Sequence, residues 1–438
     1  MSRHRPRVLF VAEAVTLAHV GRASALAQGV DARRFEAHVA CDPRCVPLLS
    51  NLGLPLHAVT SLDPVVFAQR LREGDPLYAT AELRSAVRED LKLISHVRPQ
   101  AVVGDMRVSL GIAARAAGIP YATVANAHWS PYARSRYVVP ELAIVDRFGP
   151  GLGQLLFDVL RPLTGALQVR AFNRVRCEHG LASIRPTLAH LFTDADRVWY
   201  ADVPALVPTF RAPAHHHYLG PLLWSPVEPS LLPEVLPQHR PLIYVSMGSS
   251  GPERMLAVVF QAMERMRCAG IVSTAGKGAP RNVPEFIRIR EFLPGLEAAR
   301  LADLVVCNGG SATVYQAMAA GKPVLGLPNN LDQYLMMEHV ERKGVGRWLR
   351  TGTARVETVA AAMTALLDDP AYRVRVREIE TGIRMGDGQK RLDDLVEDLL
   401  QSGRSVGTNG LEVDDTIDTT EGGADANRPS SFSLGMGR

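Results

Sequence analysis

The stretch CNGGSATVYQAMAAGKPVLGLP, residues 307–328, contains the turn that decides the fold. An apolar run ends at Cys307, two glycines follow, and a helical pattern starts at Ser311 and stops at Gly321. A second apolar run, 323–327, comes next, which is the strand–helix–strand order of a parallel α/β sheet. Glycines let a ligand approach the backbone, and the free N–H groups of a helix start attract an anion such as a diphosphate.

The same alternation extends in both directions along the chain. Further apolar runs typical of buried strands occupy 7–12, 36–41, 101–105, 119–124, 197–200, 242–246 and 270–274, with helical patterns between them. The runs fall into two successive arrays of similar size. They predict an α/β protein with two Rossmann-like parallel-sheet domains that face each other across a cleft.

The two arrays are separated by a proline-rich passage, residues 221–240, which leaves little room for regular elements. We therefore expect an N-terminal domain over 1–220, this linker, and a C-terminal domain with its final helix over 241–402. Residues 403–438 are rich in Gly, Thr, Asp and Ser and have almost no apolar periodicity, so they are expected to form a disordered tail.

Composition narrows the class of protein. With 438 residues and 47% hydrophobic residues, the chain can bury two cores. A formal charge of +4 is too small and scattered for nucleic-acid binding. The five cysteines have no zinc spacing, which favours reduced thiols and a cytoplasmic protein. Glu13 interrupts the first apolar run, and no run reaches the length of a membrane helix, although peripheral membrane contact stays open.

Polar residues follow the last strand of the quoted stretch. Asp332 and Gln333 come soon after the run that ends at 327. Ligands of parallel sheets bind beyond the carboxyl ends of the strands, so this pair should face the same crevice as Gly309, Gly310 and the hydroxyl of Thr313. A carboxylate beside an amide can bond several hydroxyls of a sugar; the alternative for the pair is a helix cap.

The block from Phe292 to Gln333 resembles the donor signature of family 1 glycosyltransferases, which include plant natural-product, macrolide and glucuronosyl transferases. The signature has an aromatic-x-Pro start, then His-x-Gly-x-x-Ser-x-x-Glu, Gly-x-Pro and Asp-Gln. This sequence gives Phe292-Leu-Pro294, NGGSATVYQ at 308–316, Gly321-Lys-Pro323 and Asp332-Gln333, with matching spacing. The resemblance implies the GT-B fold and a nucleotide diphosphate sugar as donor.

The resemblance also assigns roles to single residues. It implies that Phe292 flanks the base, that Asn308 and Ser249 meet the diphosphate, and that Gln316 reaches the ribose. Asn308 replaces a histidine, Gln316 replaces a glutamate, and Ala312 replaces a frequent asparagine. Ser249 belongs to Ser246-Met-Gly-Ser-Ser250, which is similar to the phosphate loop of the family.

Two residues of the first half suggest acid–base chemistry. His19 follows the first strand, where the family carries its general base, and Asp105 ends the third apolar run, where many members carry the aspartate that pairs with the base. A hydroxyl is a poor nucleophile until a base takes its proton, and a carboxylate can orient the imidazole. The bland alternatives are a surface histidine and an aspartate that caps a helix.

Metal and cofactor motifs are weak. Asp194-Ala-Asp196 has the spacing of a metal-binding pair, and residues 215–217 are three histidines, but a turn explains the first and no carboxylate or cysteine pattern supports the second. No dinucleotide fingerprint follows a strand. We expect no metal and no cofactor, with the nucleotide sugar acting as a substrate.

The sequence thus favours an inverting, metal-independent transferase that moves a hexose from a UDP- or dTDP-sugar to a hydroxyl. The acceptor should contact roughly 43–80 and 128–187, whose apolar and aromatic residues suggest a small lipophilic molecule. Two alternatives remain open. One is another GT-B enzyme, either a lipid-linked sugar transferase or a nucleotide-sugar 2-epimerase. The other is a nucleotide-sugar-binding protein without turnover.

Overall fold

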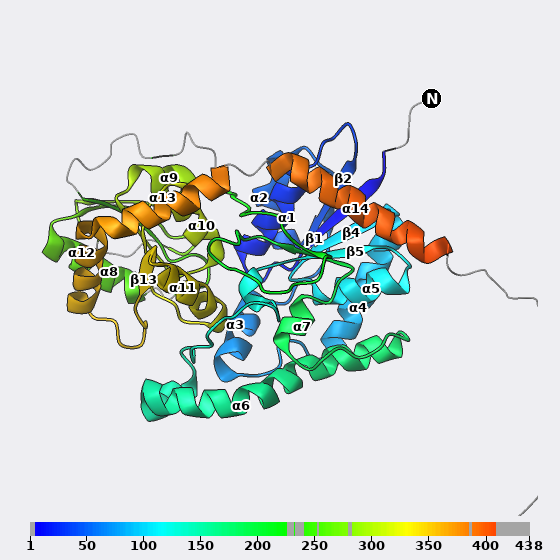
Figure 1. Ribbon diagram of the computed structural model, residues 1–438, viewed down its shortest axis with the longest axis horizontal. Helices are drawn as coiled ribbons and strands as arrows, with labels where there is room; N and C mark the ends of the chain where they lie inside the picture. The colour runs from blue at the N-terminus through cyan, green and yellow to red at the C-terminus, as the bar shows by residue number, and fades with distance from the viewer. Residues whose placement is uncertain are drawn as a thin grey trace, which may run out of the picture.

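The computed structural model of the chain describes residues 5–225, 232, 241–251, 254–278, 283–384 and 388–408. It contains two parallel sheets, each flanked by helices (Figure 1). Strand order is β3-β2-β1-β4-β5-β6-β7 in the first sheet and β10-β9-β8-β11-β12-β13 in the second. These two sheets confirm the predicted pair of α/β domains.

The first sheet is built from residues of the N-terminal half. Its strands are β1 (Arg7–Ala12), β2 (Glu36–Cys41), β3 (Leu56–Ala58), β4 (Ala101–Asp105), β5 (Tyr121–Ala125), β6 (Arg197–Tyr200) and β7 (His216–Tyr218). Its main helices are α1 (Leu17–Gly29), α3 (Pro64–Glu73), α4 (Thr80–Val97), α5 (Val108–Ala116), α6 (Ala143–Glu178) and α7 (Leu188–Phe192). Buried Val and Ala side chains of β1 and β4 pack into cores on both faces of this sheet.

The second sheet belongs to the C-terminal half. Its strands are β8 (Leu242–Ser246), β9 (Ala269–Ser273), β10 (Ile287–Arg290), β11 (Leu304–Cys307), β12 (Val324–Gly326) and β13 (Gly346–Trp348). Its helices are α8 (Arg254–Met266), α9 (Gly295–Leu301), α10 (Ser311–Ala319), α11 (Leu331–Lys343), α12 (Val356–Asp368) and α13 (Pro370–Arg384).

The two domains share a buried cluster. Tyr200 and Val203 of the N-terminal half pack with Tyr315 and Met336 of the C-terminal half. In each sheet the strand order reverses beside the first strand of the array, at the β1–β4 and β8–β11 neighbours. A doubly wound sheet opens a crevice at such a point, beyond the carboxyl ends of its strands.

The last helix, α14 (Gly388–Thr408), crosses back over the N-terminal domain (Figure 1). Its buried Leu392, Leu395, Val396 and Leu399 belong to the same core cluster as Leu26 of α1. The order of the sequence predicts that this helix belongs to the C-terminal domain, but its apolar side chains are buried against the N-terminal domain.

The structure tests the predicted start of the tail, but it describes only part of the tail and of the linker. α14 continues through Thr408 and so extends into the predicted tail, residues 403–438. Residues 409–438 of the predicted tail, and most of the predicted linker at 221–240, lie outside the described residues. Among the residues that the structure describes, no helix is both long and apolar enough to cross a membrane.

Candidate active site

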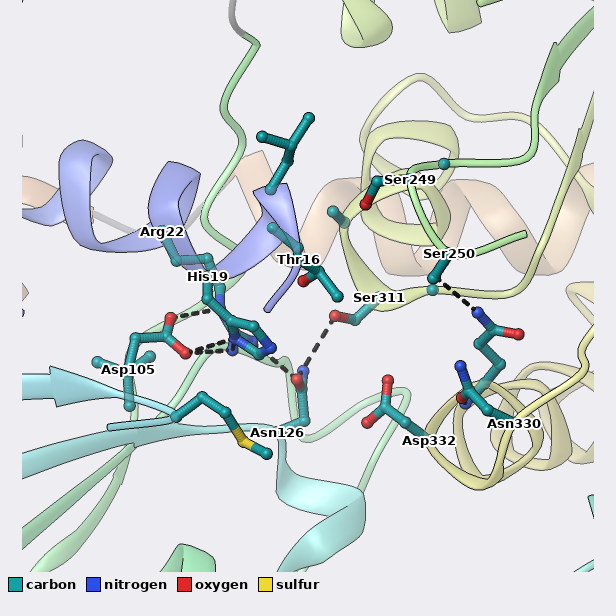
Figure 2. Close-up of a pocket in the computed structure, with 18 of the residues that line it drawn as sticks. Thr16, His19, Arg22, Asp105, Asn126, Ser249, Ser250, Ser311, Asn330 and Asp332 are labelled. Carbon is teal, nitrogen blue, oxygen red and sulfur yellow. Dashed lines mark hydrogen bonds and ion pairs between the residues drawn. The ribbon is translucent and has the colours of Figure 1, made fainter. Parts of the chain in front are cut away.

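A cleft between the domains brings the predicted site residues together. Every candidate residue except Gly309 lines it, and its wall includes the strand ends at Asp105, Ala125, Ser246 and Ser273. The residues come from both halves of the chain, which meet in Figure 2. The cleft therefore has the position that the strand order predicts.

His19 and Asp105 form a hydrogen-bonded pair in this cleft (Figure 2). His19 lies in the first turn of α1 and Asp105 ends β4, and their Nδ1 and Oδ1 atoms are 2.8 Å apart. Burial raises the pKa of Asp105, but the charges of Arg22 and His19 and their hydrogen bonds lower it overall. Nδ1 also lies 2.9 Å from a terminal nitrogen of Arg22. In the tautomer that donates its Nδ1 proton to the ionised carboxylate, Nε2 is the basic nitrogen of the imidazole.

Arg22 completes the pair and was missed by sequence reasoning. Its Nε and one terminal nitrogen donate to both oxygens of Asp105, at 2.7 and 2.6 Å. Arg22 lies three residues after His19, so both side chains leave α1 on the same face. That spacing was a usable signal, since a buried carboxylate beside a histidine requires a compensating charge.

A chain of hydrogen bonds connects this pair to the other domain. The second terminal nitrogen of Arg22 donates to Asn126 at 2.7 Å, and Asn126 donates to Asp202 at 3.2 Å. Tyr315, on α10 of the C-terminal domain, donates to the other oxygen of Asp202 at 2.9 Å. Burial raises the pKa of Tyr315 far above its ordinary value, so its hydroxyl stays protonated and donates.

The start of α10 faces the cleft. Gly310 caps the helix without a side-chain hydrogen bond, and Thr313 lines the cleft one turn later. Gly309 has a φ of +80°, and a Cβ there would lie 2.5 Å from Met337. Glycine at 309 thus serves the turn and the packing beneath it, while the free N–H groups of the helix start are available to an anion.

Asn308 and Gln333 converge on Ser250. Their side-chain amides donate to its hydroxyl oxygen at 3.2 and 3.1 Å. The orientation of each amide is fixed, because the Asn308 oxygen accepts from the backbone of Gly310 and the Gln333 oxygen accepts from that of Asn329. With both lone pairs engaged, the hydroxyl of Ser250 keeps its own proton for a further acceptor.

This arrangement changes the reading of three predicted residues. Gln333 is buried and lines the cleft, and its amide also bonds the backbone of Asn329 and the hydroxyl of Ser250. Asn308 likewise connects the loop that contains Ser250 to the glycine turn before α10, because its side chain bonds Ser250 and the backbone of Gly310. Ser249 is exposed in the cleft wall, but its neighbour Ser250, which we did not single out, has the better-defined hydroxyl.

Gln316 and Phe292 form the outer end of the donor side. Gln316 donates from Nε2 to the backbone oxygen of Trp224 at 3.0 Å. It packs so closely on Gly295 that a Cβ there would lie 2.3 Å from Oε1. Phe292 and Trp224 both line the cleft. A glutamine suits position 316 because a carboxylate could not donate to the Trp224 carbonyl.

Asp332 bridges the domains. Its Oδ1 accepts from Nε2 of His128 at 2.9 Å and from Nε1 of Trp129 at 2.7 Å. Desolvation raises the pKa of Asp332, but the hydrogen bonds from His128 and Trp129 and the charge of His128 lower it to about 2. The side chain is still 43% exposed, so its second oxygen remains open to the cleft.

The weaker metal motifs have structural explanations. Asp194 accepts from Arg115 and Arg176, and Asp196 accepts from the backbone of Tyr121 at 2.9 Å. His216 bonds the hydroxyl of Tyr200 at 2.6 Å. Within the described ranges, no group of three or more His, Cys, Asp or Glu side chains is placed to hold a metal ion.

A second, larger cavity of about 1380 Å³ adjoins the cleft. Its lining falls largely in 43–80 and 128–187, the segments from which the acceptor contacts were expected. Leu17, Phe67, Trp129 and Leu188 line both spaces, so the cavity leads toward His19.

Known proteins are similar to this chain in sequence and in fold. Residues 268–383 match the family described as "Erythromycin biosynthesis protein CIII-like, C-terminal domain". The "PGL/p-HBAD biosynthesis rhamnosyltransferase" of Mycobacterium bovis (strain BCG / Pasteur 1173P2) is 45% identical over 374 residues, 85% of this chain and 83% of that protein. An "Inactive PGL/p-HBAD biosynthesis glycosyltransferase" of the same organism is 45% identical over 262 residues, 60% of this chain and 72% of that protein.

Among solved structures, "Spinosyn Rhamnosyltransferase SpnG complexed with thymidine diphosphate" has a TM-score of 0.64 at 17% identity, covering 89% of this chain and 100% of that one. The two facing parallel-sheet domains and the cleft between them define the GT-B fold. The chain belongs to the family of natural-product glycosyltransferases that includes the PGL/p-HBAD biosynthesis rhamnosyltransferase.

Proposed function

We propose that this enzyme is an inverting, metal-independent glycosyltransferase. It moves a hexose from a UDP- or dTDP-sugar to a hydroxyl of a small lipophilic acceptor. The main observation behind this proposal is the hydrogen-bonded pair of His19 and Asp105, which lies across the cleft from the start of α10. A base on one wall and an anion site on the other are what a single in-line displacement at an anomeric carbon requires.

On the donor side, the diphosphate lies at the start of α10. The N–H groups there and the hydroxyls of Thr313 and Ser250 stabilise the negative charge that develops on the departing diphosphate. Phe292 flanks the base, and Oε1 of Gln316 accepts from a ribose hydroxyl. The free oxygen of Asp332 bonds a hydroxyl of the sugar.

On the acceptor side, Nε2 of His19 takes the proton of the attacking hydroxyl. Asp105 holds the imidazole and stabilises the imidazolium that forms. Attack comes from the face opposite the diphosphate, so one displacement inverts the anomeric centre. No step in this scheme requires a cofactor.

Metal independence is proposed because protein groups supply the charge stabilisation. The helix start, two hydroxyls and the backbone of the glycine turn act where a divalent cation would otherwise neutralise the diphosphate.

The donor and acceptor classes draw on the relatives. Binding of thymidine diphosphate by the spinosyn rhamnosyltransferase favours dTDP, and the name of the 45% identical relative favours a deoxyhexose such as rhamnose as the first sugar to test. The large adjoining cavity favours a lipophilic acceptor that can approach from a membrane surface. Five free cysteines favour a cytoplasmic location.

One alternative has a specific observation behind it. A 45% identical relative is named inactive, and Asn308 and Gln316 are held internally in this chain. A nucleotide-sugar-binding protein without turnover would bind the diphosphate and release no sugar. A 2-epimerase or lipid-linked sugar transferase has no comparable support here.

The direct test is binding of UDP, dTDP and GDP by calorimetry, with magnesium and with EDTA. We expect dTDP or UDP to bind equally in both conditions. Binding that EDTA abolishes would contradict metal independence, and binding of none of the three would contradict any nucleotide-sugar function.

A further inference from the structure

Helix α6 exposes an aligned row of apolar side chains. Leu152, Leu155, Val159, Leu163 and Leu167, together called the α6 stripe, have side chains that are 45–69% exposed. Their spacing of three or four residues places them on one face of the helix. Figure 1 shows α6 along an edge of the molecule, outside both sheets.

The last turns of α6, beyond the stripe, are apolar on the opposite face. Val169, Phe172 and Val175 are buried against the N-terminal domain. A helix at the surface of a globular protein normally covers its apolar face and turns a polar face to water. Single exposed apolar residues need no explanation, but four leucines and a valine aligned on one helix face mark an interaction surface.

The α6 stripe borders the large cavity. Leu160 both lines this cavity and is 43% exposed beside the stripe. Phe157 and Gly165, on the inner side of the same helix, line the cavity too. A molecule held at the stripe can therefore move past Leu160 and on toward His19.

Charge distinguishes between the flat surfaces that could cover the stripe. At the same helical spacing the row continues into Arg170 and Arg174, which are exposed. On a bilayer, leucines enter the acyl boundary while arginines reach anionic headgroups. In a twofold pair of α6 helices, the arginines of one copy would instead lie on the apolar start of the other stripe.

We propose that the α6 stripe docks the enzyme on an anionic lipid bilayer and that the acceptor is an amphiphile that enters the cavity from that surface. The inference rests on the proposed function for the nature of the acceptor. The docking itself needs neither donor nor acceptor, so it can be tested separately.

The test is cosedimentation of the full chain with vesicles of phosphatidylcholine, with and without phosphatidylglycerol. We expect binding to the anionic vesicles. The double variant Leu155→Glu/Val159→Glu should partition at least about tenfold more weakly, since it removes two apolar contacts and adds two negative charges. Arg170→Gln should weaken binding to anionic vesicles about fivefold and leave neutral vesicles unaffected.

The matched control is Val374→Glu, at an apolar position of α13 that is 59% exposed and remote from the stripe in sequence. It should bind vesicles like the unmodified chain. No vesicle binding, equal binding by the double variant, or a dimer that the double variant dissociates would each overturn the proposal. Calorimetric dTDP binding by the same variants reports separately on the proposed function, because the stripe lies outside the donor site.

Discussion

Arg22 donates hydrogen bonds to both carboxylate oxygens of Asp105, at 2.7 and 2.6 Å, and His19 bonds one of the same oxygens at 2.8 Å. The carboxylate that orients the proposed base is thus itself held by a buried cation. The same guanidinium bonds Asn126, which starts the hydrogen-bond chain to α10. The proposed base and the donor helix are therefore positioned by one continuous network.

Replacing Arg22 by methionine should lower transfer by up to about a hundredfold, because a small displacement of a reacting group is costly. It should also lower the free energy of unfolding by roughly 3 kcal/mol, since Asp105 is left buried without its cation. Steady-state kinetics and urea unfolding measure the two effects. Arg197→Met, which breaks the pair with Asp398 away from the cleft, is the control. Full turnover in the Arg22 variant would contradict its positioning role.

Ser250 should matter more for donor binding than Ser249. Its oxygen accepts from two fixed amides, so its proton is directed to a further acceptor, which we identify as a phosphate. Loss of a hydrogen bond to a charged group makes Ser250→Ala bind dTDP about tenfold or more weakly in calorimetry. Ser250→Thr keeps the hydroxyl and should retain most of the affinity. A larger loss in Ser249→Ala than in Ser250→Ala would reverse this assignment.

Restoring the family glutamate at position 316 should weaken the site rather than improve it. In Gln316→Glu a carboxylate would face the carbonyl oxygen of Trp224, to which Nε2 now donates at 3.0 Å. We expect dTDP affinity to fall by about fivefold or more, since an interior acceptor loses its donor. Thermal shift with and without dTDP measures this loss of affinity. A Gln316→Glu variant that binds dTDP more tightly would show that Gln316 weakens the donor site.

The interdomain contact of Asp332 should depend on pH. Its pKa is about 2 in the folded chain, against an ordinary value of 3.8. A lowered folded pKa adds stability above the unfolded value, and this contribution is lost as the pH falls toward the folded value. The difference in unfolding free energy between the unmodified chain and Asp332→Asn should therefore be constant above about pH 5 and shrink below about pH 4. A difference that grows on acidification would contradict the ionised bridge.

Much of this architecture could be predicted from the sequence. The apolar runs, including those of the stretch at 307–328, have local patterns, and they fall in β1, β2, β4, β5, β6, β8, β9, β11 and β12. The three-residue strands β3, β7 and β13 are too short to show a period. The long α6 is obscured by Pro150 and Pro162 and by its apolar character on both faces.

The candidate site also contains residues that a local pattern marks and residues that only the tertiary structure reveals. His19 and Asp105 could be picked out from local patterns, because one follows a predicted strand and the other ends one. Asn126 and Trp224 gain their positions only through packing between segments distant in sequence, so no local pattern marks them. The hydrogen bonds of Gln333 to Asn329 and Ser250 depend on side-chain positions, which the spacing of a motif does not contain.

The most direct test of the central claim compares the unmodified enzyme with His19→Ala. Calorimetry measures dTDP affinity, and a transfer assay uses a dTDP-hexose with 4-octylphenol as the probe acceptor. We predict an unchanged affinity for dTDP and transfer that is slower by about a hundredfold or more, because the acceptor hydroxyl keeps its proton. Unchanged turnover in His19→Ala would contradict the account, since the pair of His19 and Asp105 would then have no part in the chemistry.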